Sequence, residues 1–364
     1  MIGMEQAALD TPALLIDLDT MEGNLRTMAG FFAGQHAKLR PHAKTHKSPV
    51  IAHKQLALGA VGITCAKLGE AEVMVEAGVP DILVANQIVG HTKIARLVAL
   101  AHHARLTVAA DDPQNLRDIS QAAEASGVEI GVLVEVNTGM NRCGVEPGED
   151  AVSLAAFAAD LPGVRFRGLQ AYEGHLVNTE DESARRAAVA AAMAPVRETR
   201  EAITARGLPV EIVSGGGTGT FALTGALPFF DEVQAGSYVF MDAKYATIGG
   251  VGERFGTALT VLASVVSRPT ADRAILDVGR KAIGTDHGTP YLKGYRDEAE
   301  FKGFSEEHAT LAVSGAARDL RPGDTVEIVP GHGCTTVNLY DRYHAMRNGV
   351  VEAIWPVAGR GRSA

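Results

Sequence analysis

The stretch DILVANQIVGHTKIARLVALAHHARLTVAAD, residues 81–111, contains the pattern from which the fold of the chain can be inferred. It begins with a β-rich run at 81–87, continues with an amphipathic segment at 91–102 and ends with a second β-rich run at 106–111. Short apolar runs bounded by polar residues are typical of strands, and longer segments with an apolar face are typical of helices. The stretch therefore predicts a strand, a helix and a second strand.

The same alternation extends in both directions, from about residue 39 to 238. Further β-rich runs lie at 39–44, 62–67, 129–137, 166–172, 211–217 and 232–238, and further helix candidates at 48–58, 69–77, 113–126, 149–160, 180–206 and 220–226. Eight alternating units are what a (β/α)8 barrel requires. We therefore predict an α/β fold whose TIM-type barrel spans residues 22–247.

The pattern changes after residue 247, where strand-like runs follow one another without long helices. These runs are TALTVLASVV, RAILDVG, ATLAVSG, DTVEIVP and TTVNLY. Such a series is typical of antiparallel sheets, so we predict a second, mostly antiparallel β domain over 248–364. Residues 13–19 form an early strand candidate, and we expect the N-terminal residues 1–21 to join the second domain.

Composition excludes several classes of protein. The formal charge of −9 argues against a protein that binds nucleic acid by neutralising phosphates. The N-terminal residues contain neither a basic leader nor a long apolar run, so we expect no signal peptide and no membrane span. Three widely spaced cysteines indicate a reducing compartment rather than a disulfide framework. We expect a cytoplasmic enzyme with a small-molecule substrate.

The stretch RPHAK, residues 40–44, places basic side chains at the end of the first predicted barrel strand. Strand alternation puts Arg40, His42 and Lys44 on one face, and functional groups of such barrels gather where the strands end. These side chains could simply be solvated at the rim. If Lys44 faces a phosphate-binding loop across the barrel mouth, its amine could instead form a Schiff base with an aldehyde cofactor.

The stretch SGGGTGT, residues 214–220, follows the seventh predicted barrel strand. Glycines let a ligand approach the backbone, and free N–H groups at the start of a helix favour phosphate. An ordinary glycine-rich turn is the alternative. The loops after strands seven and eight often bind phosphate in this fold, which favours a phosphate site. The stretch lacks a GK[ST] ending, so it is not a nucleotide P-loop.

The stretch VPGHGC, residues 329–334, contains a histidine and a cysteine two positions apart. In an extended segment, His332 and Cys334 would project to one side and could bind a divalent metal. A chance pairing is the alternative, because two ligands alone are a weak signal.

Taken together, these motifs resemble the D-threonine aldolase and D-serine dehydratase family. The resemblance covers nearly the whole chain, and it is carried by DTPALLIDLD (10–19), RPHAKTHKSP (40–49), VLVEVNTGMNRCGV (132–145), LQAYEGH (169–175), SGGGTGT (214–220), QAGSYVFMD (234–242), LDVG (276–279) and PGHGC (330–334). It implies a pyridoxal-phosphate enzyme of fold type III, with an alanine-racemase-like barrel and a β domain. It also implies a divalent metal, a D-β-hydroxy-α-amino acid substrate and a homodimer.

The resemblance also implies roles for individual residues. Lys44 matches the Schiff-base lysine, Arg142 the arginine near the pyridine ring and Tyr172 the tyrosine at that ring. His332 and Cys334 match the metal pair, which in some aldolases is His-x-Asp. The remaining expected cofactor contacts are His42 and Ser214, with the phosphate cradle formed by Gly216, Gly217, Thr218, Gly236, Ser237 and Tyr238.

One departure from the family pattern concerns the base. Some aldolases read Tyr-His-Gly, whereas this chain reads Tyr172-Glu173-Gly174-His175. We take His175 as the candidate base for the substrate hydroxyl. The predicted reaction is retro-aldol cleavage to glycine and an aldehyde; D-serine or 3-hydroxy-D-aspartate dehydration at the same site is the alternative. A non-catalytic cofactor carrier is a third hypothesis. The thiolate favours zinc, and manganese, cobalt and magnesium stay open.

Overall fold

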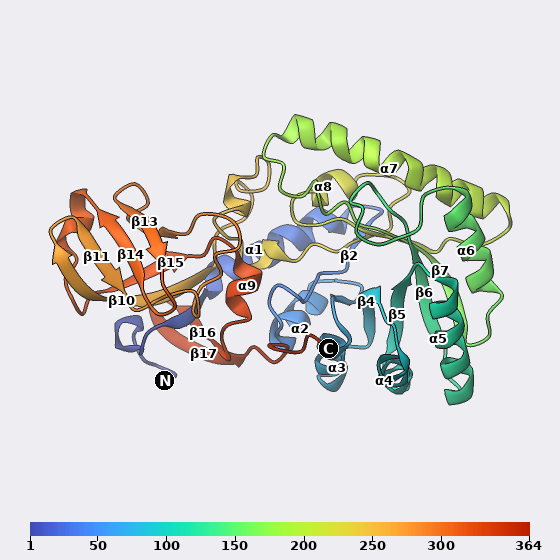
Figure 1. The fold of residues 1–364 in the computed structure, drawn as a ribbon, viewed down its shortest axis with the longest axis horizontal. Helices are drawn as coiled ribbons and strands as arrows, with labels where there is room; N and C mark the ends of the chain where they lie inside the picture. Colours follow the sequence, from blue (N-terminus) through green and yellow to red (C-terminus); the bar gives the residue numbers. More distant parts are fainter. The chain divides into compact units, whose positions relative to one another are not determined.

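The computed structural model describes all residues, 1–364, and they form two compact units (Figure 1). The barrel unit consists of Met28–Lys44, Pro49–Gly236 and Arg362–Ala364. The β unit consists of Met1–Thr27, Thr45–Ser48 and Ser237–Gly361. The domain boundaries expected from the sequence, 22–247 and 248–364 joined by 1–21, stay a prediction.

The barrel unit is built on eight parallel strands, as predicted. The sheet order is β2-β9-β8-β7-β6-β5-β4-β3. A parallel bridge between His42 and Thr64 connects its two edges, and the amide of Ala43 donates to the carbonyl of Thr64 at 2.8 Å. The strands are β2 (Lys38–Leu39), β3 (Ile63–Cys65), β4 (Asp81–Gln87), β5 (Arg105–Ala110), β6 (Ile130–Glu135), β7 (Val164–Ala171), β8 (Ile212–Gly215) and β9 (Glu232–Val233).

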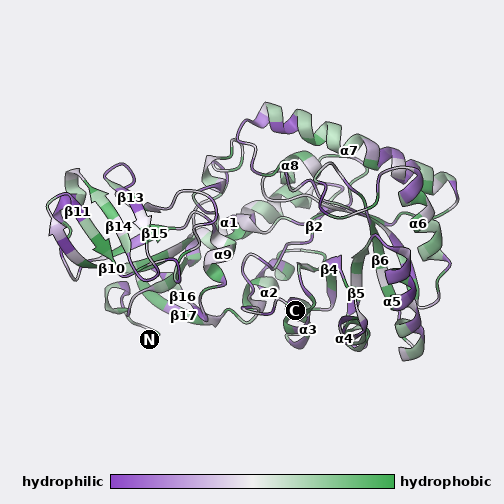
Figure 2. Ribbon diagram, in the orientation of Figure 1, coloured by the Kyte–Doolittle hydropathy of each residue, from purple (hydrophilic) through white to green (hydrophobic).

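Helices lie along the outside of these strands (Figure 1). Their bounds are α2 (Pro49–Ala57), α3 (Leu68–Glu76), α4 (His91–Ala101), α5 (Pro113–Ser126), α6 (Glu149–Ala159), α7 (Glu182–Ala205) and the short α8 (Phe221–Thr224). Helix α5 shows why the segments fold this way. Asp112 caps its N-terminus by accepting the amide of Asn115, Pro113 opens its first turn, and Gly127 ends it in the left-handed conformation. Hydrophilic and hydrophobic bands alternate on these helices (Figure 2), as amphipathic helices require.

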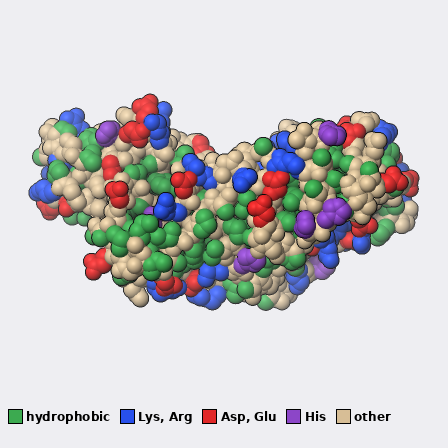
Figure 3. Space-filling view, turned by 90° about the horizontal axis from the view of Figure 1, so that it is seen from below, with side chains coloured by type: hydrophobic (Ala, Val, Ile, Leu, Met, Phe, Trp, Pro, Cys, Tyr) green, Lys and Arg blue, Asp and Glu red, His purple; other side chains and the backbone are tan.

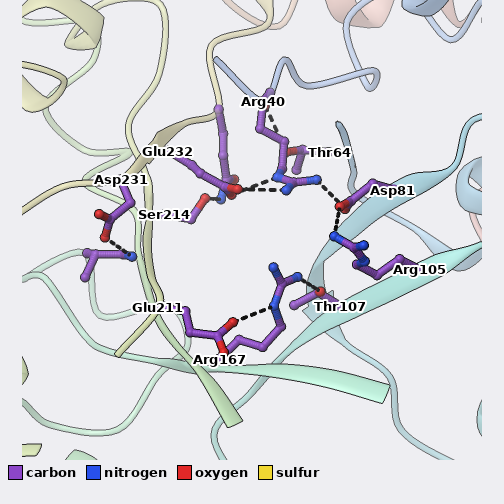
Figure 4. A network of polar contacts seen from close by, with 12 residues as sticks. Arg40, Thr64, Asp81, Arg105, Thr107, Arg167, Glu211, Ser214, Asp231 and Glu232 are labelled. Atoms are coloured by element: carbon purple, nitrogen blue, oxygen red, sulfur yellow. Dashed lines mark hydrogen bonds and ion pairs between the residues drawn. The ribbon is translucent and has the colours of Figure 1, made fainter. Parts of the chain in front are cut away.

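A network of charged side chains lines the N-terminal end of the barrel (Figure 4). Arg40, only 3% exposed, donates two hydrogen bonds of 2.7 Å to Glu232 and one of 2.7 Å to Asp81. Glu232 and Asp81 begin β9 and β4, so this is the end of the barrel that serves stability. The expectation that Arg40 joins Lys44 at the catalytic mouth is therefore wrong, because its guanidinium is fully engaged at the other end of the strands.

The β unit contains a nine-stranded, mostly antiparallel sheet. Its strands follow the order β13-β14-β11-β10-β1-β16-β17, and β15 pairs with both β10 and β12. Strand β1 lies antiparallel to β10 and parallel to β16. The bounds are β1 (Ala13–Asp17), β10 (Leu259–Thr270), β11 (Arg273–Leu276), β12 (Tyr291–Leu292), β13 (Ala299–Phe304), β14 (Ala309–Val313), β15 (Thr325–Val329), β16 (Arg342–Arg347) and β17 (Val350–Pro356).

The short helix α9 (Gly333–Val337) corrects one strand assignment. The run TTVNLY, 335–340, was expected to be a strand, but its first residues form the second half of this helix. Apolar and β-branched residues fit a short buried helix as well as a strand, so periodicity cannot separate the two over five residues. The helix matters because it directly follows His332.

The remaining helical elements are α1 (Leu18–Ala33) and the 3₁₀ turns η1 (Gln6–Ala8), η2 (Ser237–Val239), η3 (Tyr245–Thr247) and η4 (Gly315–Asp319). None of the helices has both the length and the apolar character needed to cross a membrane. On the face seen in Figure 3, acidic and basic side chains are interspersed rather than collected into a single basic field.

Candidate functional site

Lys44, Tyr172 and Arg142 lie together in the barrel unit, at the C-terminal ends of its strands. The Nζ atom of Lys44 is 5.7 Å from the centroid of the Tyr172 ring, and the guanidinium carbon of Arg142 is 5.4 Å from the same centroid. Tyr172 directly follows β7, and Lys44 follows the bridge that joins the two edges of the barrel. The fold thus brings three of the predicted site residues to one aromatic ring.

The Tyr172 ring is held from several sides. The hydroxyl of Thr138 donates to the main-chain carbonyl of Tyr172 at 2.9 Å. A Cβ atom at Gly174 would overlap the ring edge, so only glycine fits at that position. A Cβ at Gly217 would lie 3.6 Å from the ring, which places the glycine loop directly beside it. The ring is therefore a fixed surface between the glycine loop and the two basic side chains.

A buried carboxylate supports Arg142. Glu135, at the end of β6, lies 3.8 Å from the Arg142 guanidinium and accepts a 2.5 Å hydrogen bond from Gln87 Nε2. Burial raises the pKa of Glu135, while the Gln87 bond and the charge of Arg142 oppose the rise. The sequence did not single out this residue. It gives the half-exposed Arg142 a fixed anionic neighbour.

The glycine loop 214–220 follows β8 and packs tightly against the segment after β7. Side chains at Gly215 and Gly219 would overlap the carbonyls of Ala171 and Val177, and Gly216 has a φ of +69°, where glycine is strongly preferred. At Gly215 and Gly219 the loop therefore packs directly against neighbouring backbone, which only glycine allows. A loop of this composition, with few side chains to cover its amides, fits a phosphate-bearing cofactor. Thr218 in this loop is 1% exposed.

Glu173, which the sequence reasoning left without a role, is fully buried against this loop. Its carboxylate accepts the hydroxyls of Thr220 and Thr224 at 2.6 and 2.5 Å and the amide of Gly216 at 3.2 Å. An acidic residue two positions after the end of β7 and beside a glycine was the available sequence signal.

His175, the candidate base, is exposed and lies near the loop that follows β6. Its Nε2 atom is 3.7 Å from the position that a Cβ at Gly139 would occupy. The side chain of Asn137 shapes that loop by accepting the amides of Gly139 and Asn141, both at 3.1 Å. The imidazole is therefore accessible to solvent beside that loop.

Other predicted cofactor residues lie in different surroundings. The hydroxyl of Ser214 is fully buried and accepts a 2.8 Å hydrogen bond from Gln234. Nδ1 of His42 accepts the amide of Lys44 at 3.3 Å, which fixes the backbone at the lysine. Gly236 follows β9 in the barrel unit, whereas Ser237 and Tyr238 belong to η2 of the β unit. Their role at a phosphate stays a prediction.

The β unit holds a separate cluster of metal-ligating groups around His332. Nδ1 of His332 donates to Asp286 at 2.5 Å, and Asp286 also accepts the hydroxyl of Thr335 at 2.7 Å. The ring of His287 stacks on that of His332 with centroids 4.1 Å apart. Ligand atoms of Asp286, His287 and His332 all lie within 4.8 Å of one another. The sequence reasoning found His332 but missed the other two, because they lie in an irregular segment distant in the chain.

The electrostatics of this cluster favour a cation. Burial, the largest influence, lowers the pKa of His332, but the hydrogen bonds and charges of Cys334 and Asp286 together raise it to about 9. The Nε2 atom of His287 is buried and has no hydrogen-bond partner. Imidazole, thiolate and carboxylate donors suit zinc and related divalent ions. The residues present therefore fit a metal.

Asp242 holds Gly333, the first residue of helix α9, which lies between the two predicted metal residues. Its carboxylate, 1% exposed, accepts the amides of Gly333 and Tyr245, both at 2.9 Å. Burial raises the pKa of Asp242, and the two amides and the neighbouring histidines oppose the rise. His332 and Cys334 thus flank a glycine whose backbone is held in place, although the segment is helical rather than extended from Gly333 onward.

Two family models match the chain. One describes the N-terminal domain of alanine racemase and matches residues 16–244; the other describes a serine dehydratase domain and matches residues 258–346. A D-threonine aldolase from Arthrobacter sp is 41% identical over 98% of this chain and 94% of its own length. A 3-hydroxy-D-aspartate aldolase from Paracoccus denitrificans is 39% identical over 99% of this chain and 94% of its own.

A comparison with solved structures also finds a D-threonine aldolase. The crystal structure of D-threonine aldolase from Filomicrobium marinum superposes with a TM-score of 0.96 at 43% identity, covering 99% of this chain and 98% of the other. Dehydratases are also related: D-threo-3-hydroxyaspartate dehydratase from Delftia sp. is 34% identical over 93% of this chain and 94% of its own length.

Proposed function

The chain belongs to the pyridoxal-phosphate lyase family that includes the D-threonine aldolases and D-serine dehydratases, and from this premise we propose that it is an aldolase of D-β-hydroxy-α-amino acids. The proposed products are glycine and an aldehyde. The observation that carries the proposal is the placement of Lys44 and Arg142 on the ring of Tyr172, with Gly217 beside it.

The barrel unit would hold the cofactor. Lys44 would bind the aldehyde carbon, Tyr172 would pack against the pyridine ring and Arg142 would face the ring nitrogen. When bound, pyridoxal phosphate supplies an electron sink for charge that develops at the substrate α-carbon. His42 and Ser214 would support the lysine and the loop, and the phosphate would be bound by Gly216, Gly217, Thr218, Gly236, Ser237 and Tyr238.

The β unit would hold the metal. His332 and Cys334 are the proposed ligands, and Asp286 would fix the imidazole so that Nε2 is the free ligand atom. A bound divalent ion supplies Lewis acidity toward the substrate hydroxyl. The thiolate of Cys334 favours zinc. Manganese, cobalt or magnesium would occupy the site if the supply of metal ions, rather than ligand preference, determined which ion binds.

The proton of the substrate β-hydroxyl must leave before the Cα–Cβ bond breaks. We assign its removal to the imidazole of His175. The hydroxyl oxygen then becomes the carbonyl oxygen of the aldehyde, and the electron pair of the broken bond stays with the α-carbon. A proton from solvent then adds to that carbon and completes glycine, which balances the proton that His175 returns to water. The exposed position of His175 supports this role, because a base must reach the substrate and return its proton to water.

Incubation of the metal- and cofactor-loaded protein with D-threonine tests the proposal. We expect glycine and acetaldehyde in equal amounts and no turnover of L-threonine. Formation of 2-oxobutyrate and ammonia would make the protein a dehydratase, and absence of any product would contradict both reactions. We further propose a cytoplasmic homodimer. Light scattering of the purified protein would test the dimer, and fractionation of the cells that produce it would test the location.

A further inference from the structure

We propose that Glu173 is a positioning residue that holds the glycine loop 214–220 in the form that binds the cofactor phosphate. The inference rests on the proposed use of pyridoxal phosphate, and it assigns a task to a buried carboxylate that the reaction itself does not use.

The side-chain hydrogen bonds of Glu173 join it to the glycine loop and to the short helix α8 that follows the loop. One carboxylate oxygen accepts the hydroxyls of Thr220 and Thr224, and the other accepts the amide of Gly216. The side chain is fully buried. A buried carboxylate requires several donors, and the loop and α8 provide all three.

Thr220 extends this support to the next residue of the loop. Its hydroxyl donates to Glu173 and at the same time accepts the amide of Gly217 at 3.1 Å. The carboxylate therefore fixes the direction of that hydroxyl and, through it, a second glycine amide. Gly216 is in the left-handed region with a φ of +69°, a conformation that glycine leaves easily when nothing holds it. Glu173 thus orders a flexible backbone before the cofactor binds, which reduces the entropy lost on binding.

If Glu173 acted only through its charge, its replacement would change the affinity for the cofactor phosphate in the opposite direction. A buried negative charge close to the loop would repel a phosphate dianion, so removal of the charge alone would strengthen binding. A positioning role predicts weaker binding, because the amide of Gly216 and the hydroxyl of Thr220 would lose their common acceptor. Replacement by glutamine separates the two, since it keeps the shape and removes the charge.

The test compares two ligands that differ only in the phosphate. Apo-protein is titrated with pyridoxal phosphate and with pyridoxal, and both dissociation constants are taken from the absorbance of the bound chromophore. The measured quantity is the ratio of the pyridoxal constant to the pyridoxal phosphate constant. We expect E173A to lower this ratio about tenfold, because a buried amide loses its acceptor. We expect E173Q to lower it about threefold, because one acceptor oxygen remains.

The matched control is D231N. Asp231 (Figure 4) is likewise a carboxylate that accepts an amide, that of Val213, which lies in strand β8 before the glycine loop begins. The ratio of the two dissociation constants measured for D231N should stay at the wild-type value. T220V should lower the ratio as well, and the E173A/T220V pair should lower it by less than the product of the two single effects, since both act through one chain of hydrogen bonds.

Two results would overturn the inference. One is an unchanged ratio in E173Q and in folded E173A, which includes an equal loss of affinity for both ligands, and the other is a higher ratio in E173Q. If E173A does not fold, E173Q and T220V still decide the matter. Failure of the wild-type protein to bind pyridoxal phosphate would instead contradict the proposed function.

Discussion

At the scale of single residues, the site places two cations, Lys44 and Arg142, at one aromatic ring. Each is about as far from the ring centre as a cation–π contact allows, 5.7 and 5.4 Å. Arg142 thus brings a positive charge close to the ring beside which Lys44 lies. Glu135 beside Arg142 partly offsets that charge.

His175→Asn tests the proposed base. We expect kcat for D-threonine to fall by about 10² to 10⁴, the usual contribution of a positioned proton acceptor, with KM changed by only a few-fold. Steady-state kinetics with acetaldehyde detection measures both constants. The control is His91→Asn, in α4 on the outside of the barrel, which should leave kcat unchanged. Normal turnover by the His175 variant would contradict the assignment and would mean that another group removes the proton from the substrate hydroxyl.

Glu135→Gln tests the buried carboxylate through the pH dependence of stability. Because burial raises the pKa of Glu135 in the folded state, the folded protein holds this proton at a higher pH than the unfolded chain does. At a pH below the ordinary range of carboxyl pKa values, Glu135 is protonated in both the folded and the unfolded state. Its ionisation then has no influence on stability. As the pH rises through the folded pKa, ionisation destabilises the wild-type protein relative to the variant.

The melting temperature of E135Q minus that of the wild type should therefore be more positive at pH 8 than at pH 4. The control is the same replacement at an exposed carboxylate, Glu76→Gln at the end of α3, measured at both pH values. A difference that is more negative at pH 8 would mean that Arg142 stabilises the ionised form more than burial destabilises it.

At the scale of elements, short connections rather than long strands determine the chemistry. The loop between β8 and α8 is tied down by Glu173, and the start of α9 is tied down by Asp242. Both anchors are buried carboxylates that accept amides of glycines. Each fixes a backbone that would otherwise be mobile, which is how a scaffold makes a loop precise enough for binding.

Asp286→Asn tests the support of the metal ligand. The uncharged oxygen of asparagine accepts the hydrogen bond from Nδ1 of His332 less strongly than the carboxylate does. The imidazole is then held less firmly, so we expect zinc affinity to fall about tenfold or more. Competition with a chromophoric chelator measures the affinity. Exposed Asp297→Asn in the same unit should leave it unchanged. A chelator should also stop turnover while the cofactor absorbance persists; activity that survives complete metal removal would contradict the metal proposal.

Gly219→Ala tests the tight packing of the glycine loop. Its Cβ would overlap the carbonyl of Val177, so the loop must move. We expect a loss of about 1–3 kcal/mol in stability, as for other overpacked sites, together with weaker cofactor binding. Gly30→Ala in α1 is the control: nothing lies within 4 Å of its Cβ position, and it should stabilise the helix by about 0.5–1 kcal/mol. Equal effects of the two changes in a denaturant titration would contradict the packing argument.

At the scale of the whole molecule, the sequence predicts what is periodic and local. Strand β4 and helix α5 have the predicted bounds, because each has a clear apolar period and clear end signals. The run TTVNLY was expected to be a strand, but its first three residues belong to helix α9. The sequence could not show this, because a five-residue element carries no decisive period. Asp286 and His287 were missed because tertiary folding alone brings them to His332.

The central claim is that Lys44 carries the cofactor, and reductive trapping tests it most directly. The loaded protein is treated with borohydride, digested and examined by mass spectrometry for a peptide that bears the reduced pyridoxyl phosphate group. Our account predicts that this mass is found on Lys44 and is lost in K44A. Labelling of another lysine in the native protein, or unchanged labelling in K44A, would contradict it.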